Sequence, residues 1–340
     1  MKERSLYPMK FEPIYKTKIW GGEKLKTILN KTDAPENAGE SWEISAVQDN
    51  ISVLANGFLK GNNLQELIEI YMGDLLGPQV YDKFGNEFPL LIKFIDANDN
   101  LSVQVHPGDE TARKRHNAYG KTEMWYVIQA DPGSELISGF NQEISKEEFV
   151  ARLNDNRIVE VLNFTEVKAG DVFFIPAGRI HATGKGILFA EIQQTSDITY
   201  RVYDWDRKDK QGKGRELHTE LARDVIDYSP VDKARTDYRD EMDKPVRIIS
   251  SEHFVSNYIH LETNMTKSYV SCNSFVVLIC VKGKLKLKWE HGSISMEKGE
   301  TVLLPYELME VSFVPESESI LLETYIDMPD ESGTGSDKAE

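Results

Sequence analysis

The chain is poor in cysteine: only Cys272 and Cys280 occur among its 340 residues, and neither belongs to a CxxC pair. Because both lie in apolar stretches, we expect buried, reduced thiols and no disulfide scaffold. Long apolar runs are absent too. None approaches the roughly 18 residues that a membrane-spanning helix needs, and no secretory hydrophobic segment follows the charged start. These absences predict a cytoplasmic protein without a membrane partner.

Positive charge is also in short supply. The sequence holds 40 lysines and arginines against 56 aspartates and glutamates, a formal net charge of −16. This balance argues against a nucleic-acid partner. The sequence contains neither a P-loop nor a GxGxxG pattern, so we expect no nucleotide site. If the ligand is an anion, basic residues gathered at one place must bind it.

What the sequence has instead is short segments rich in Val, Ile, Leu, Phe and Tyr, separated by glycine and proline. This pattern is typical of a mainly β protein, a sandwich or a barrel. Two stretches, 63–75 and 145–153, predict helices because each has an apolar face and begins like a capping box. We expect both helices to pack on a sheet and to carry no chemistry. Strands are expected at residues 88–95, 124–128, 172–175 and 275–281.

One pattern of the sequence occurs twice. The first copy is Gly170, Pro176, Gly178 and His181, and the second copy has Gly299, Pro305, Glu307 and Glu310 at the same spacing, with 125–128 resembling 275–278. Because the second copy lacks the histidine, we expect it to keep the strand-turn-strand frame without a ligand. The sequence thus predicts two related β units: residues 1–235 with a metal site and added helices, and residues 236–327 without a metal site. A disordered tail is expected over 328–340.

Four side chains of the first unit are candidate metal ligands. Successive residues of a strand point to opposite faces, so Gln104 and His106 share one face, as do Lys121 and Glu123. The four candidate ligands Gln104, His106, Glu123 and His181 offer an amide oxygen, a carboxylate and two imidazoles. This set suits a divalent transition metal, although ligand softness alone does not choose zinc over manganese, cobalt or iron.

Several motifs carry a resemblance to a known family. The spacing G-x5-P-x-G-x2-H from Gly170 to His181 resembles the second signature motif of the cupin fold. The segments SVQVHP (102–107), GKTEMWYV (120–127) and QTSDITYRVYD (194–204) resemble the type I mannose-6-phosphate isomerases in their short bacterial form, over about residues 8–327. The resemblance implies two cupin-like barrel or jelly-roll units and one zinc ion, bound by Gln104, His106, Glu123 and His181.

The same resemblance implies how a phosphosugar is held. Arg201, in its Ser-Asp-x-x-x-Arg context, matches the catalytic arginine of the family, and Lys93, Ser102 and Lys121 match positions around the substrate. Lys93 also interrupts an apolar run, and a bound phosphate would explain a buried lysine there. Trp20, beside two glycines, is expected to wall the sugar pocket.

Other polar and aromatic residues receive no site role. Trp42 and Trp205 are expected in the core, and the charged segment 204–215 is expected to be an exposed loop. His116 is expected in an exposed loop within the basic insertion 108–120. The remaining histidines without a partner pattern are His218, His253, His260 and His291.

The implied activity is metal-dependent interconversion of mannose 6-phosphate and fructose 6-phosphate through a cis-enediolate. Arg201 and Lys121 would orient the substrate and stabilise charge. The proton carrier stays open between Asp197, Lys121, a hydroxide at the metal and another carboxylate. The alternatives are isomerisation of another phosphosugar, such as glucose 6-phosphate, and non-catalytic binding of a sugar phosphate. We expect a monomer or homodimer whose partner is a small phosphosugar.

Overall fold

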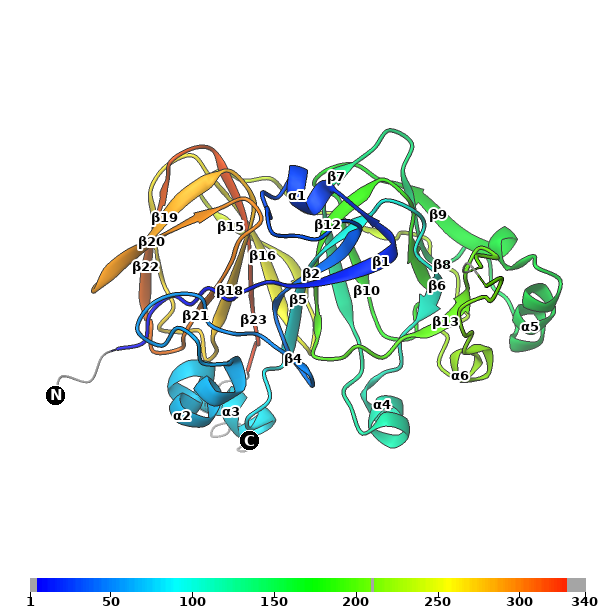
Figure 1. Ribbon diagram of the computed structural model, residues 1–340, viewed down its shortest axis with the longest axis horizontal. Helices are drawn as coiled ribbons and strands as arrows, with labels where there is room; N and C mark the ends of the chain where they lie inside the picture. The colour runs from blue at the N-terminus through cyan, green and yellow to red at the C-terminus, as the bar shows by residue number, and fades with distance from the viewer. Residues whose placement is uncertain (1–4, 209–210, 329–340) are drawn as a thin grey trace, which may run out of the picture.

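Alternating apolar residues place most of the chain in antiparallel sheets in the computed structural model, which describes residues 5–208 and 211–328 (Figure 1). The first unit, on the right of Figure 1, pairs a seven-stranded with a five-stranded sheet. In spatial order the larger sheet contains β1 (Ile14–Gly22), β2 (Ala38–Ile44), β5 (Leu90–Ala97), β12 (Ile187–Gln194), β7 (Glu123–Ala130), β10 (Val172–Ile175) and β14 (Arg235–Thr236). The smaller sheet contains β13 (Tyr200–Tyr203), β6 (Val103–Val105), β11 (His181–Thr183), β8 (Glu135–Phe140) and β9 (Leu162–Glu166).

The second unit, on the left of Figure 1, repeats this arrangement. One sheet contains β15 (Pro245–Ser250), β16 (Val255–Leu261), β23 (Ser319–Tyr325), β18 (Val276–Lys282) and β21 (Thr301–Leu304). The other contains β17 (Met265–Ser268), β22 (Glu310–Pro315), β19 (Lys284–Trp289) and β20 (Gly292–Glu297). The order β5-β12-β7-β10 matches β16-β23-β18-β21, and β6-β11-β8-β9 matches β17-β22-β19-β20. The predicted fold class, mainly β with two cupin-like units, is therefore confirmed, although the sheets of the described chain form open sandwiches and no closed barrel.

The turn that introduces β10 is repeated before β21. Gly170 and Gly299 both have a φ of +88°, a conformation that favours glycine. The strand register corrects one detail of the predicted repeat. Ile175 pairs with Glu123, whereas Leu304, at the same distance from its glycine, pairs with Val276. Residues 125–128 therefore correspond to 278–281 and not to 275–278. The register between two strands is set by their pairing in the sheet, and apolar strands of similar sequence do not show which register that is.

Along the chain, short helices connect the strands. In the described residues they are α1 (Lys24–Thr27), α2 (Leu64–Leu76), α3 (Pro78–Phe84), α4 (Asp109–His116), α5 (Lys146–Asn154), α6 (Thr219–Arg223) and a 3-10 turn (Ile158–Val161), beside a short ladder of β3 (Ala46–Val47) and β4 (Asn50–Ile51). None of these helices combines the length and the apolar character needed to cross a bilayer.

Both predicted helices are present. α2 begins with a complete capping box, in which the Glu66 N–H donates to Asn63 Oδ1 and the Asn63 N–H donates to Glu66 Oε2, each at 2.9 Å. At α5 only half of the box forms, since Ser145 Oγ accepts from the Glu148 N–H at 3.0 Å. The Glu148 carboxylate instead accepts from Arg152 within the same helix.

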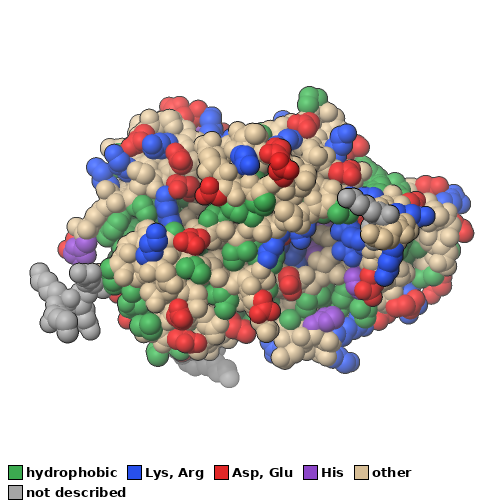
Figure 2. Space-filling model, in the orientation of Figure 1, with side chains coloured by type: hydrophobic (Ala, Val, Ile, Leu, Met, Phe, Trp, Pro, Cys, Tyr) green, Lys and Arg blue, Asp and Glu red, His purple; other side chains and the backbone are tan. Residues whose placement is uncertain are grey.

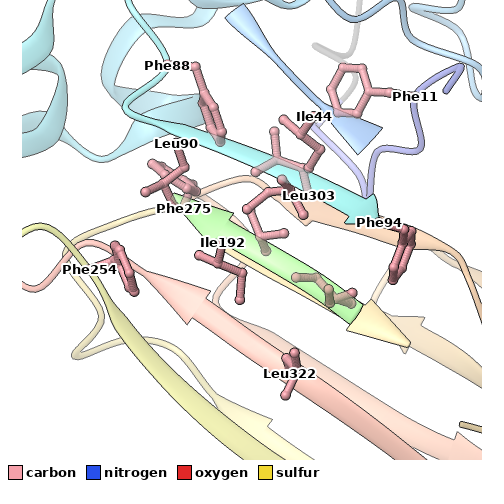
Figure 3. Close-up of a cluster of buried hydrophobic side chains, with 14 of the residues drawn as sticks. Phe11, Ile44, Phe88, Leu90, Phe94, Ile192, Phe254, Phe275, Leu303 and Leu322 are labelled. Atoms are coloured by element: carbon pink, nitrogen blue, oxygen red, sulfur yellow. The ribbon is translucent and has the colours of Figure 1, made fainter. Parts of the chain in front are cut away.

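The largest apolar core lies between the two units. Phe94 of β5 and Ile192 of β12 lie in one cluster with Phe275, Leu303 and Leu322 of the second unit (Figure 3). Every one of these side chains is fully buried. One face of the seven-stranded sheet is thus committed to packing, so that only its other face is open to chemistry.

Parts of the N-terminal half pack on the second unit. Met9 forms a bridge with Leu303, and the backbone of α2 accepts hydrogen bonds from Phe275 and Tyr306. α2 and α3 consequently lie beneath the second unit in Figure 1. The boundary between residues 235 and 236 stays a prediction, and the tail predicted over 328–340 lies outside the described residues except for Met328.

Candidate metal centre and active site

The four candidate ligands come from both sheets of the first unit. Gln104 lies in β6 and pairs with His181, the first residue of β11, while His106 follows β6 directly. Glu123 begins β7 in the opposite sheet. The positive φ of Gly178, +87°, belongs to the turn that leads the chain into His181. A site between two sheets therefore collects residues separated by up to 77 positions in the sequence.

The ligand atoms lie close together and are buried. His106 Nε2 is 3.6 Å from Glu123 Oε2, and His181 Nε2 is 3.4 Å from Glu123 Oε1. All three ligand atoms lie within 4.8 Å of one another, and none of the three residues is more than 1% exposed. This is the one group of three or more His, Cys, Asp and Glu ligands found in the described part of the chain.

The hydrogen bonds of the two histidines determine which nitrogens are available. The Nδ1 atoms of His106 and His181 lie 2.8 Å from the backbone carbonyls of residues 198 and 179. A carbonyl can only accept, so each Nδ1 carries the proton and each Nε2 presents a lone pair. Burial lowers the pKa of His181 to about 3 and that of His106 well below its usual range, which keeps both rings neutral.

The residues present fit a metal ion. Glu123 Oε1 is buried and has no hydrogen-bond partner among the described residues, although an orphaned carboxylate oxygen is costly. It lies beside the His181 Nε2 lone pair, and the Gln104 amide lies 3.3 Å from the same nitrogen. The two ends of an amide are nearly alike in shape, so rotation by 180° presents Gln104 Oε1 to this space. Two imidazoles, a carboxylate and an amide oxygen form a donor set that suits a divalent transition metal.

Lys121 connects this centre to the adjoining pocket. Its Nζ lies 2.5 Å from Glu123 Oε2 and 3.1 Å from His106 Nε2. Burial lowers the pKa of Lys121, but the negative charges of Glu123 and Glu191 raise it more, so the side chain is an ammonium. Burial raises the pKa of Glu123 to about 7 against the opposing charge of Lys121.

A pocket of about 350 Å³ lies next to the centre. Figure 2 shows Lys and Arg side chains gathered over the first unit on this face of the molecule. His106, Glu123 and His181 do not line the pocket, but Gln104 and Lys121 do. Gln104 contacts His181, and Lys121 contacts both His106 and Glu123. The predicted site residues that line it are Trp20, Lys93, Ser102, Gln104, Lys121, Asp197 and Arg201.

Lys93 already has partners within the protein. Its Nζ lies 3.1 Å from Glu191 and 5.0 Å from the ring centroid of Trp42. Trp42 is buried as predicted, but its ring also faces this cation. Glu191, Glu40, Lys18 and Arg215 line the pocket too and were not predicted to do so. The sequence feature that could have predicted Glu191 is the one that singled out Lys93, a charged residue within an apolar strand.

One of the two predicted loops contains a helix. The insertion 108–120 includes α4, and His116 at its end bonds the Tyr200 hydroxyl at 2.7 Å. The described residues of the segment 204–215 contain no helix or strand and most are exposed, as predicted. Asp204 is the exception: it is only 6% exposed and binds Arg207 and Arg215 of the same segment.

Besides His116, two of the unassigned histidines form side-chain hydrogen bonds. His218 Nδ1 accepts a hydrogen bond from the Arg201 N–H at 3.1 Å, which helps to hold the backbone of β13. His260 lies between Asp240 and Glu318, with each ring nitrogen 2.7 Å from a carboxylate oxygen. Neither histidine lines the pocket described above.

The second unit has lost the ligands at the corresponding positions. By strand register Val276 stands where the first unit has Glu123, and Glu310 stands where it has His181. A fold of two related β units, with a His-Glu-His cluster beside a cationic pocket in the first one, defines a cupin-type protein with a candidate metal centre.

Comparisons with known proteins place the chain more narrowly. Residues 9–131 match the family model for the phosphomannose isomerase type I catalytic domain. The chain is 36% identical to the mannose-6-phosphate isomerase ManA of Bacillus subtilis, over 92% of this chain and 98% of that protein. It is 38% identical to the mannose-6-phosphate isomerase of Streptococcus mutans, over 85% and 89% of the two chains. The crystal structure of the mannose 6-phosphate isomerase from B. subtilis superposes with a TM-score of 0.85 at 32% identity, covering 94% of this chain and all of that one. The chain therefore belongs to the type I phosphomannose isomerase family.

Proposed function

We propose that the protein interconverts mannose 6-phosphate and fructose 6-phosphate, using one zinc ion bound by Gln104, His106, Glu123 and His181. The observation that carries this proposal is the burial of the unpartnered Glu123 Oε1 beside the His181 Nε2 lone pair, with His106 Nε2 3.6 Å from the other oxygen of Glu123, next to a pocket lined by lysines and arginines. Relatives of similar length bear the name of this activity.

The residues of the pocket suit the chemistry of an aldose–ketose isomerase. When bound, the metal supplies a Lewis acid for the oxygens at C1 and C2 of the sugar. Lys121 places a buried ammonium where negative charge develops on the enediolate, and such preorganised charge is usually a large catalytic contribution. Arg201 supplies a second cation on the other sheet, held by Ser102 Oγ at 3.3 Å.

We assign the proton transfer between C2 and C1 to Asp197. Its carboxylate lines the pocket, is exposed, and has no hydrogen-bond or ion-pair partner within the described parts of the chain. The other candidates are engaged: Lys121 binds Glu123, and Glu191 binds Lys93 and the Trp125 ring N–H. A general base must be able to reach the substrate and exchange a proton with it, which a free carboxylate does most readily.

A coupled assay with mannose 6-phosphate tests the proposal. Chelation should abolish isomerisation of the full chain, and added zinc should restore it, with fructose 6-phosphate as the product. Full activity in a sample shown to be metal-free, or restoration by manganese, cobalt or iron but not by zinc, would contradict the proposed zinc enzyme.

The same assay separates the alternatives. Turnover of glucose 6-phosphate in preference to mannose 6-phosphate would indicate another isomerase, and binding without turnover would indicate a sugar-phosphate-binding protein. The cytoplasmic location and the monomeric or dimeric state remain predictions.

A further inference from the structure

The cations around the pocket form two groups that differ in how their charge is balanced. The lysines lie in or beside the seven-stranded sheet, and each has a carboxylate at contact distance. The pairs are Lys93 with Glu191 at 3.1 Å, Lys18 with Glu40 at 2.8 Å and Lys121 with Glu123 at 2.5 Å. These ammonium groups are therefore neutralised within the protein and leave little excess charge for an anionic substrate group.

The arginines lie in β13 of the five-stranded sheet and in the segment after it, and their charge is in excess. Arg201 donates only to neutral oxygens, the Ser102 hydroxyl at 3.3 Å and a backbone carbonyl at 2.9 Å. Arg215 and Arg207 share one buried carboxylate, that of Asp204. Burial and the nearby positive charge of Arg215 lower the pKa of Arg201, in keeping with uncompensated positive charge here.

Arg215 is held in a fixed orientation within the pocket wall. Asp204 accepts from its Nε at 2.7 Å and from its Nη2 at 2.5 Å, which is the bidentate geometry of a carboxylate and a guanidinium. These bonds leave Nη1 without a partner in the described residues. The side chain is 31% exposed and lines the pocket together with Arg201. Arg207, in contrast, is not part of the lining and also lies 3.6 Å from Asp99.

We propose that Arg215 binds the phosphate of the substrate, and that Asp204 is a positioning residue that holds Arg215 for this purpose. The inference rests on the proposed function, since it names the part of that same pocket that takes the 6-phosphate. Arg201 pairs with Gln104, and Gln104 pairs with His181. The end of the pocket that contains Arg201 is therefore two strand spacings, about 10 Å, from His181. An open-chain hexose 6-phosphate spans this interval with C1 and C2 toward the metal ligands.

The test compares two half-exposed, ion-paired arginines. Arg215→Gln removes the proposed phosphate ligand, and Arg115→Gln is the matched control, because Arg115 is 28% exposed at its side chain, pairs with Asp224 at 2.7 Å and does not line the pocket. Binding of inorganic phosphate to the zinc-loaded full chain is measured by calorimetry, and KM is measured with mannose 6-phosphate. We expect Arg215→Gln to weaken phosphate binding and raise KM roughly ten- to a hundredfold, as for a lost charge-assisted hydrogen bond. Zinc content should not change, and Arg115→Gln should behave as the wild type.

Two further variants separate binding from positioning. Arg215→Lys should recover part of the phosphate affinity, since it keeps the charge but not the planar fork. Asp204→Asn should weaken phosphate binding less than Arg215→Gln does. Wild-type phosphate affinity in Arg215→Gln, or no measurable phosphate binding by the wild type, would overturn the inference. A wild type that binds phosphate through Arg215 but does not turn over mannose 6-phosphate would instead refute the proposed isomerase function and leave the phosphate subsite standing.

Discussion

Replacing Glu123 by glutamine should destabilise the metal-free protein, because it leaves the ammonium of Lys121 buried without its nearest counter-charge. Lys121 is 4% exposed and Glu123 is fully buried, and the two are joined by a 2.5 Å hydrogen bond. Removing one partner of a buried ion pair typically costs about 3–5 kcal/mol. Since Glu191 and Glu40 also raise the pKa of Lys121, some counter-charge remains, and we expect a loss of about 3 kcal/mol, the low end of that range.

The assay is urea unfolding in the presence of chelator, followed by tryptophan fluorescence. Trp125 is a suitable reporter because its ring centroid lies 5.4 Å from that of His181. The double variant Glu123→Gln with Lys121→Met removes both charges and should recover most of the lost stability. Measured together with the single variant Lys121→Met, it gives the coupling free energy of the pair. Equal destabilisation of Glu123→Gln and of the double variant would refute the reasoning, because the cost would then not come from the orphaned ammonium.

Three other perturbations have defined outcomes. Arg201→Ala should lower kcat roughly a hundredfold without changing the circular dichroism spectrum, as for the loss of a preorganised cation; near-normal turnover would remove Arg201 from the catalytic set. Burial lowers the pKa of His260, but its hydrogen bonds to Asp240 and Glu318 raise it more, so its pKa is higher in the folded than in the unfolded protein. The ion pairs of His260 therefore stabilise the fold fully at a pH below the pKa of the unfolded state, and this stabilisation is lost as the pH rises through the pKa of the folded state. His260→Gln should thus lower the melting temperature more at about pH 6 than at about pH 9, and a pH-independent effect would argue against this ion pairing. Asn63→Ala should cost about 1 kcal/mol in urea unfolding through loss of the capping box at α2, whereas an equal cost for Gln65→Ala, which keeps the cap, would show that the loss does not come from capping.

Much of the fold was predictable because its signals are local. The strand expected at 172–175 is β10, and the helix expected at 63–75 is α2, since alternation and a capping box act within a few residues. The repeated turn at Gly170 and Gly299 was equally visible. The register of the second copy was not, because apolar strands of similar composition pair equally well until the sheet fixes their neighbours.

The candidate site was only partly predictable. The ligand types and the cations Lys93, Lys121 and Arg201 stood out as polar residues in apolar or motif-like surroundings. Their pairing did not: Lys93 lies 3.1 Å from Glu191, and its role as a phosphate ligand stays a prediction. Charge matching depends on distances across a sheet, which alternation along one strand does not contain.

The sequence by itself therefore determined which residues can bind a metal, where the turns fall and that the second unit lacks its histidine. These properties follow from residue chemistry and from backbone preferences over a few positions. Only the tertiary structure decided that each oxygen of Glu123 lies beside an imidazole Nε2, and that Asp204 holds Arg215 in the pocket wall. Such contacts join segments that are distant along the chain, and they exist only once the two sheets have packed face to face.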